Sequence, residues 1–298
     1  MGVEEAMHTD YTRITGIGDE GSPGIKEQID NHLQLGWDSI ELRNVDGQNV
    51  CEMDDAAFDL VYGAMEATGF TAAGFGSAIA NWARPVTTPF EQDTEDLRRA
   101  APRMHRLKTP YIRIMSYPND NLPEREWKQM VLWRLRELTR IAEGEGIILV
   151  HENCDGWASK SPENLQELLA IIDSPALRIV FDVGNPVGYG GNRDSTWEFY
   201  RAARPYIEHF HIKDCRPAED GSIEHTMPGE GACDVEAIMR DLVRGGYTGR
   251  FSIEPHIATQ VHLGGAAAEG MDQRGIYLDY GKKANEIWER ISNHTSTK

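Results

Sequence analysis

The stretch Leu149-Val150-His151-Glu152-Asn153-Cys154 joins an apolar run to a carboxylate, and the strand pattern ends soon afterwards at Asp155-Gly156. Three later stretches have the same form, a short apolar strand that ends on a residue able to bind a metal. They are Ile179-Val180-Phe181-Asp182, His209-Phe210-His211 and Phe251-Ser252-Ile253-Glu254. In parallel β/α folds the carboxyl ends of the strands lie on one face. The pattern therefore predicts that four strand-end side chains meet there: Glu152, Asp182, His211 and Glu254.

Short apolar strands alternate with amphipathic helices along the chain, which is typical of parallel β/α architecture. Neither a GxGxxG nor a P-loop motif follows the first strand, so the usual marker of an open nucleotide-binding sheet is missing. Eight such units in 298 residues favour a single (β/α)8 TIM barrel. The strands are expected near 11–17, 39–43, 70–75, 111–115, 147–152, 177–182, 207–212 and 249–254.

The predicted organisation is a flexible N-terminal segment at 1–10 and one barrel at 11–298. The distance from His211 to Glu254 is longer than one β/α unit, and the excess is assigned to a rim insertion near 217–231. A second rim insertion, rich in Gly and Ala, is expected near 256–275. Either insertion would admit a bulky substrate or dock a small partner subunit, and a homo-oligomer is also expected.

Composition excludes several classes of function. The formal net charge of −18 opposes binding to nucleic acid, which depends on Lys and Arg, and gives no attraction to anionic membranes. No apolar stretch is long enough to cross a bilayer, and the polar start lacks the layout of a secretory signal. The four cysteines include no CxxC pair, which is typical of a reduced, cytoplasmic protein. We expect a small-molecule ligand.

Three carboxylates and one imidazole in one volume indicate a divalent cation. Like charges held close together raise one another's pKa values, which is unfavourable without a cation. Three oxygen donors and one nitrogen suit Mn²⁺, Mg²⁺ or Co²⁺, and Zn²⁺ is harder to exclude. Each residue taken alone is more typical of a helix cap, a surface charge or a structural histidine. Four at matching strand ends favour the metal site.

The second half of the chain also resembles the sugar phosphate isomerase/epimerase superfamily, which has a xylose isomerase-like TIM barrel. The matching stretches are Val150-His151-Glu152-Asn153, Phe181-Asp182-Val183-Gly184-Asn185-Pro186, His211-Ile212-Lys213-Asp214, Gly229-Glu230-Gly231, Gly246-Tyr247-Thr248-Gly249 and Ile253-Glu254-Pro255. The resemblance implies one metal ion, with Mn²⁺ expected first, held by Glu152, Asp182, His211 and Glu254. It also implies that Glu152 and Glu254 move a proton through a metal-bound enediolate.

Six further residues are predicted to bind substrate, and they are Asn185, Lys213, Arg216, Trp157, Arg43 and His256. Many epimerases place His at the position of Asn185, so the substrate contacts of those enzymes do not transfer directly. Strand alternation puts Glu41 and Arg43 on one face, where a buried ion pair between them is the alternative interpretation. The same alternation turns His151 outward from the barrel, and His209 is expected to serve packing.

The leading hypothesis is a metal-dependent isomerase or epimerase of a sugar, keto-sugar or related polyol. A lyase of the inosose dehydratase or 3-keto-C-glycoside deglycosidase type is the alternative, because it begins with the same proton abstraction. An AP endonuclease would need a His-rich zinc cluster and a basic groove, and Asn185 and the acidic charge count against it. A non-catalytic metal-binding protein is the remaining interpretation.

Overall fold

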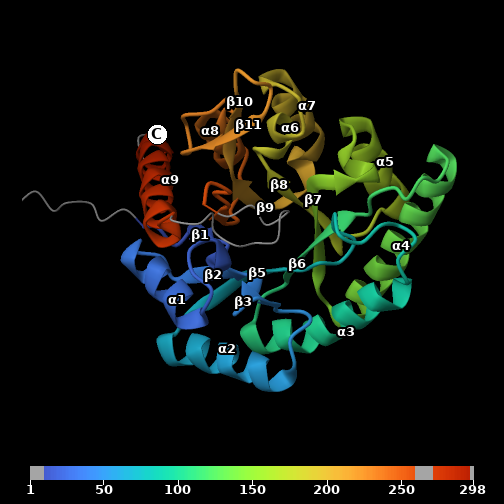
Figure 1. Ribbon diagram of the computed structural model, residues 1–298, viewed down its shortest axis with the longest axis horizontal. Helices are drawn as coiled ribbons and strands as arrows, with labels where there is room; N and C mark the ends of the chain where they lie inside the picture. The colour runs from blue at the N-terminus through green and yellow to red at the C-terminus, as the bar shows by residue number, and fades with distance from the viewer. Residues whose placement is uncertain (1–9, 259–270, 296–298) are drawn as a thin grey trace, which may run out of the picture.

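The computed structural model describes residues 10–258 and 271–295. Eight parallel strands form one sheet in the order β1-β12-β9-β8-β7-β6-β5-β2. A parallel bridge between Ile17 and Glu41 joins its two ends, so the sheet closes on itself. Helices surround the strands in Figure 1, with α1 and α9 adjacent on one side and α4 and α5 on the other. The predicted (β/α)8 barrel is confirmed.

The barrel strands lie close to their predicted positions. They are β1 (Ile14–Gly16), β2 (Ser39–Leu42), β5 (Thr71–Gly76), β6 (Tyr111–Ser116), β7 (Ile148–Gly156), β8 (Leu177–Asp182), β9 (Ile207–Ile212) and β12 (Phe251–Ile253). The helices are α1 (Ile25–Gln34), α2 (Asp55–Thr68), α3 (Phe90–Leu107), α4 (Glu124–Glu145), α5 (Pro162–Ile172), α6 (Asn185–Gly188), α7 (Arg193–Ala203), α8 (Val235–Arg244) and α9 (Gln273–Thr295). Three short 3₁₀ turns are η1 (Gly18–Glu20), η2 (Trp157–Ser159) and η3 (Arg204–Tyr206).

Local sequence signals explain where the helices begin and end. The Asp54 side chain accepts a hydrogen bond from the Ala57 amide at the start of α2, and Ser161 caps α5 in the same way. Gly69 ends α2 with φ of 70°, a left-handed conformation that glycine adopts without steric cost. The helices therefore return the chain to each next strand through short connections.

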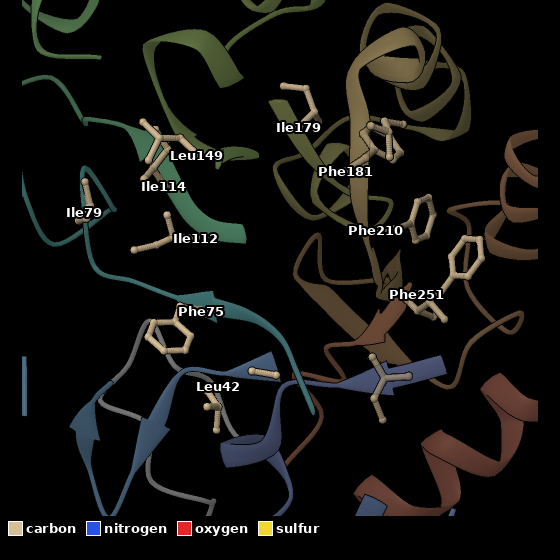
Figure 2. Close-up of a cluster of buried hydrophobic side chains, with 14 of the residues drawn as sticks. Leu42, Phe75, Ile79, Ile112, Ile114, Leu149, Ile179, Phe181, Phe210 and Phe251 are labelled. Carbon is tan, nitrogen blue, oxygen red and sulfur yellow. The ribbon is translucent and has the colours of Figure 1, made fainter. Parts of the chain in front are cut away.

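The apolar core fills the space between the strands and the helices. Figure 2 shows side chains from strands all around the barrel in this layer. The ring of Phe181 on β8 packs at a tilt against Tyr200 of α7, and that of Phe251 on β12 packs at a tilt against Trp288 of α9. His151 on β7 is fully buried. Burial lowers its pKa to about 3, which fits its predicted structural role.

The largest differences from the sequence prediction lie at the carboxyl-end rim. Strand β7 continues beyond Glu152 to Gly156, because it still pairs with β6 after a register shift. The insertion near 217–231 contains a hairpin of β10 (Asp214–Pro217) and β11 (Ile223–Thr226) rather than a simple loop. A second small hairpin joins β3 (Asn44–Val45) to β4 (Gln48–Asn49). The predicted segment 1–10 and insertion 256–275 fall largely on 1–9 and 259–270, outside the described residues.

His32 on α1 makes the stability of the fold depend on pH. Its ring is fully buried, with Nδ1 2.7 Å from the Gln28 carbonyl and Nε2 3.2 Å from the Tyr277 hydroxyl. Burial lowers the pKa of His32 from 6.5 to about 4. His32 therefore stays neutral in the folded state at pH values where it takes up a proton in the unfolded state. The contribution of neutral His32 to the free energy of unfolding is complete above pH 6.5 and is lost as the pH falls towards 4.

We expect this group to lower the free energy of unfolding by about 1.4 kcal/mol per pH unit within that window. Urea unfolding at pH 7, 6 and 5 of the wild type and His32→Asn measures it. The variant should be less stable at pH 7, because buried hydrogen bonds are lost, and the difference should narrow at pH 5. An equal difference at all three pH values would contradict the prediction.

Candidate metal centre

Four side chains converge towards the carboxyl-end rim of the barrel from β7, β8, β9 and β12, and Glu152 does so from within β7. They are Glu152, Asp182, His211 and the residue directly after β12, Glu254. One carboxylate oxygen from each acid and one ring nitrogen of His211 lie within 4.8 Å of one another. Strand register explains the meeting, because Asp182 pairs with His211 and Ser252 also pairs with His211 in parallel ladders. The predicted four residues are brought together.

The donor atoms of this cluster fit a divalent cation. His211 Nδ1 is buried, makes no hydrogen bond to a described residue, and lies 3.6 Å from Glu254 Oε2. Three carboxylate oxygens and a neutral imidazole nitrogen form the mixed oxygen and nitrogen set that Mn²⁺, Mg²⁺ and Zn²⁺ accept. The cluster therefore has the donors of a metal site.

Lys213 is the positive charge nearest to these carboxylates. Its Nζ lies 2.5 Å from Asp182 Oδ2 and 3.0 Å from Glu254 Oε2, and the side chain is buried. Burial raises the pKa of Asp182 to about 7, assisted by the charges of Glu254 and Glu152, although Lys213 opposes the shift. Carboxylates so close together need positive charge to stay ionised.

Asn185 at the start of α6 belongs to the site. Its Nδ2 donates to Glu152 Oε1 at 3.0 Å, and its backbone amide donates to Asp182 Oδ1 at 3.1 Å. Asn153 holds the same strand end, because its side chain makes two hydrogen bonds to the backbone of Asp182. Asn185 thus orients the carboxylate of Glu152. Many epimerases carry His in place of this asparagine.

Arg43 and His256 both contact the carboxylate of Glu254. Arg43 Nη1 lies 3.2 Å from Glu254 Oε1, and His256 Nε2 lies 3.3 Å from the same oxygen. Both cations also contact Glu20, a buried acid of η1. Burial opposes ionisation of Glu254, but Lys213 and His256 outweigh it and hold the pKa of this carboxylate well below its usual range. The alternative interpretation from the sequence, a buried ion pair between Arg43 and Glu41, is wrong, because Arg43 pairs with Asp19, Glu20 and Glu254.

Glu41 instead contacts two histidines of β9. Its carboxylate lies 2.8 Å from His209 Nε2 and 3.1 Å from His211 Nε2. Three buried residues of the site were missed from sequence: Arg113, Glu20 and, as a partner of His211, Glu41. Arg113 Nη1 lies 3.2 Å from Glu152 Oε2 and 3.9 Å from Glu254 Oε1. Alternation along β6 carried this signal, because Ile112 and Ile114 flank an arginine that must face the barrel interior.

Two predicted substrate-binding residues are not in the cluster. Trp157 is only 2% exposed, donates to Glu124 and packs against Lys128, so it serves the core. The Arg216 side chain is 50% exposed and pairs with Glu224 across the β10–β11 hairpin. The residues that line the small cavity at the site are Arg43, Trp82, Arg113, Met115, Glu152, Cys154, Lys213, Glu254 and His256.

A larger hollow of about 670 Å³ lies outside the barrel between α8 and α9. None of the four converging side chains lines it, and charged surface residues such as Arg240, Arg244 and Glu286 form its walls. It is wide because it is open to solvent. The small interior cavity, by contrast, holds the buried acids, so the chemistry is assigned there.

A family model described as xylose isomerase-like TIM barrel matches residues 29–274. The chain belongs to this family. Within the residues that the structure describes, no helix combines the length and the apolar character needed to cross a membrane.

Curated relatives of this xylose isomerase-like barrel match over a shorter range. The chain is 29% identical over 147 residues to an inosose dehydratase of Clostridium beijerinckii. The matched residues make up 44% of this chain and 47% of the relative. A fructoselysine 3-epimerase of Escherichia coli O157:H7 is 28% identical over 132 residues, or 42% of this chain and 46% of that protein. The chain thus spans about half the length of the curated relatives that it matches.

A solved xylose isomerase-like TIM barrel protein from Mycobacterium smegmatis, in complex with magnesium, superposes on this barrel with a TM-score of 0.69. The sequence identity is 17%, and the match covers 93% of this chain and 96% of the other. At that identity the likeness supports the fold alone. Relatives of this family are enzymes, both epimerases and dehydratases.

Proposed function

We propose that this chain is a divalent-metal-dependent isomerase or epimerase of a sugar, keto-sugar or related polyol. It would act by removing a proton from a carbon next to a carbonyl and returning a proton to the substrate. One observation carries the proposal: Glu152 and Glu254 reach a single buried cluster from β7 and from the end of β12, with Asp182 and His211 between them. Two carboxylates that face one small volume can take a proton and return it.

The residues of the chain divide the work. Glu254 accepts the carbon-bound proton as an ionised carboxylate, and the positive charges of Arg43, Lys213 and His256 beside its oxygens favour that ionised form. Glu152 starts in its protonated form and gives that proton to the carbon, while the proton on Glu254 later passes to solvent; Asn185 fixes the orientation of the Glu152 carboxyl group. Arg113 lies against both glutamates and donates hydrogen bonds to a substrate oxygen that carries developing negative charge. Trp82 and Met115 form the apolar wall against which the carbon skeleton packs.

The metal is proposed to be held by Glu152, Asp182, His211 and Glu254, and Mn²⁺ is the first candidate. Bound there, a divalent ion would polarise a carbonyl and stabilise negative charge on oxygen. Lys213 contributes a second fixed positive charge beside Asp182. Self-association and a small partner subunit stay predictions from the sequence.

A lyase is the second candidate, and the inosose dehydratase relatives favour it. The first step would be the same, with Glu254 taking the proton next to the carbonyl. In a lyase, a hydroxyl or aglycone on the neighbouring carbon then leaves with a proton from Glu152, and a double bond forms. The two candidates therefore share a first step and differ in the product.

The decisive experiment incubates the protein and Mn²⁺ in D₂O with a ketohexose, an inosose and a 3-keto-glycoside, followed by NMR. Deuterium next to the carbonyl together with an epimer or isomer is the expected result. Release of water or of an aglycone would assign the lyase. Bound Mn²⁺ without exchange in any of the three compounds would overturn both candidates and leave a metal-binding protein without this chemistry.

A further inference from the structure

Glu41 extends from β2 into the interior of the barrel and reaches the base of the cluster. Both of its carboxylate oxygens lie 3.1 Å from His211 Nε2, although β1 and β12 separate β2 from β9 around the sheet. Its Oε2 also lies 2.8 Å from His209 Nε2. The three side chains are buried, so solvent does not compete for these hydrogen bonds.

These contacts determine which nitrogen of His211 carries the proton. An ionised carboxylate only accepts hydrogen bonds, and both Glu41 oxygens lie within hydrogen-bond distance of a histidine Nε2 atom. His211 therefore donates from Nε2. In the neutral imidazole the other nitrogen, Nδ1, then carries a lone pair. Nδ1 is the atom that lies 3.6 Å from Glu254 Oε2 and faces the acids.

We propose that Glu41 is a positioning residue that fixes His211 as an Nδ1 metal ligand. The proposal rests on the metal centre of the proposed function. Carboxylates that hold the second nitrogen of a metal-binding histidine commonly set its tautomer and ring orientation. His209 holds the other side of Glu41, so the carboxylate is anchored between two imidazoles.

Hydrogen bonds explain why Glu41, His209 and His211 lie close together, and no second metal is needed. The three residues also form a group whose donor atoms lie within 4.8 Å of one another. Both Nε2 atoms in that group, however, are engaged with the carboxylate. Arg43, the residue directly after β2, forms ion pairs with Asp19, Glu20 and Glu254 instead.

The test compares Mn²⁺ binding by isothermal titration calorimetry in the wild type, Glu41→Gln and Glu208→Gln. Glu208 is the matched control, because it lies on β9 beside His209 but bonds the Tyr111 hydroxyl away from the cluster. We expect Glu41→Gln to weaken Mn²⁺ binding about 10- to 100-fold, and Glu208→Gln to leave it unchanged. Equal affinity in Glu41→Gln and wild type would overturn the proposal.

Two further outcomes separate the possible failures. A wild type that binds no Mn²⁺, Mg²⁺ or Zn²⁺ would overturn the proposed function and this inference together. If Glu41→Gln does not fold, NMR of the ¹⁵N-histidine-labelled wild type with Zn²⁺ bound, where His211 cannot be doubly protonated and still be a ligand, decides the matter without a variant. A neutral His211 protonated on Nε2 supports the proposal, and one protonated on Nδ1 overturns it.

Discussion

Replacement of Glu254 by Gln should reduce proton exchange between substrate and solvent by about 10²- to 10⁴-fold. Gln keeps the size of the side chain and one oxygen atom, but it cannot accept a proton from carbon. Glu152→Gln should have a similar effect, since the proposed transfer needs both carboxylates. Deuterium incorporation from D₂O into the responsive hydroxyketone, followed by NMR, measures both variants. The metal content of each must be measured in parallel, because both residues are also proposed ligands.

Glu230→Gln is the matched control for these variants. Glu230 is exposed and lies on the rim loop next to the β10–β11 hairpin, outside the cluster, so exchange should stay at the wild-type rate. Exchange at the wild-type rate in Glu254→Gln with metal bound would show that this carboxylate is not the base. Loss of exchange together with loss of metal would point to a ligand role alone.

Asp214→Ala should destabilise the protein by about 3 kcal/mol. Asp214 is buried, and its carboxylate accepts hydrogen bonds from the backbone amides of Cys215, Gly229, Gly231 and Cys233. Alanine leaves these donors without their acceptor, and a buried unsatisfied group costs about 1–3 kcal/mol. Water that enters the space relieves part of the total.

Chemical denaturation with urea, monitored by circular dichroism, measures this effect. Glu219→Ala is the control, since Glu219 is exposed at the tip of the same hairpin and should change the free energy of unfolding by less than about 0.5 kcal/mol. Because Asp214 follows Lys213, the variant should also weaken Mn²⁺ binding as the rim loop loosens. Unchanged stability would mean that the loop does not depend on this carboxylate.

Much of the fold could be read from local patterns. Asp54 and Ser161 cap helices as their residue types predict, and Gly69 ends a helix in the left-handed conformation. The hairpin after Asp214 was not predicted, because its order depends on amides that lie 15 to 19 residues further along the chain. Strand β7 was predicted too short, because its last pairs depend on a register shift against β6.

The candidate site divides in the same way. Glu152, Asp182, His211 and Glu254 each follow an apolar run in the sequence, so their convergence follows from a parallel barrel. Trp157 and Arg216 were assigned to the site because they follow strand ends, yet one packs in the core and the other pairs across a surface hairpin. A position in a rim loop does not specify the direction of a side chain.

The linear pattern alone predicted the barrel, the positions of its strands and the three acids and one imidazole at its rim, because alternation and spacing are local properties of a chain. Only the tertiary structure decided which charges these groups meet. Arg113 reaches Glu152 from the neighbouring β6, and Glu41 reaches His211 from 170 residues away. Such contacts form across the barrel interior after the sheet closes, so they depend on three-dimensional geometry that no short stretch of sequence encodes.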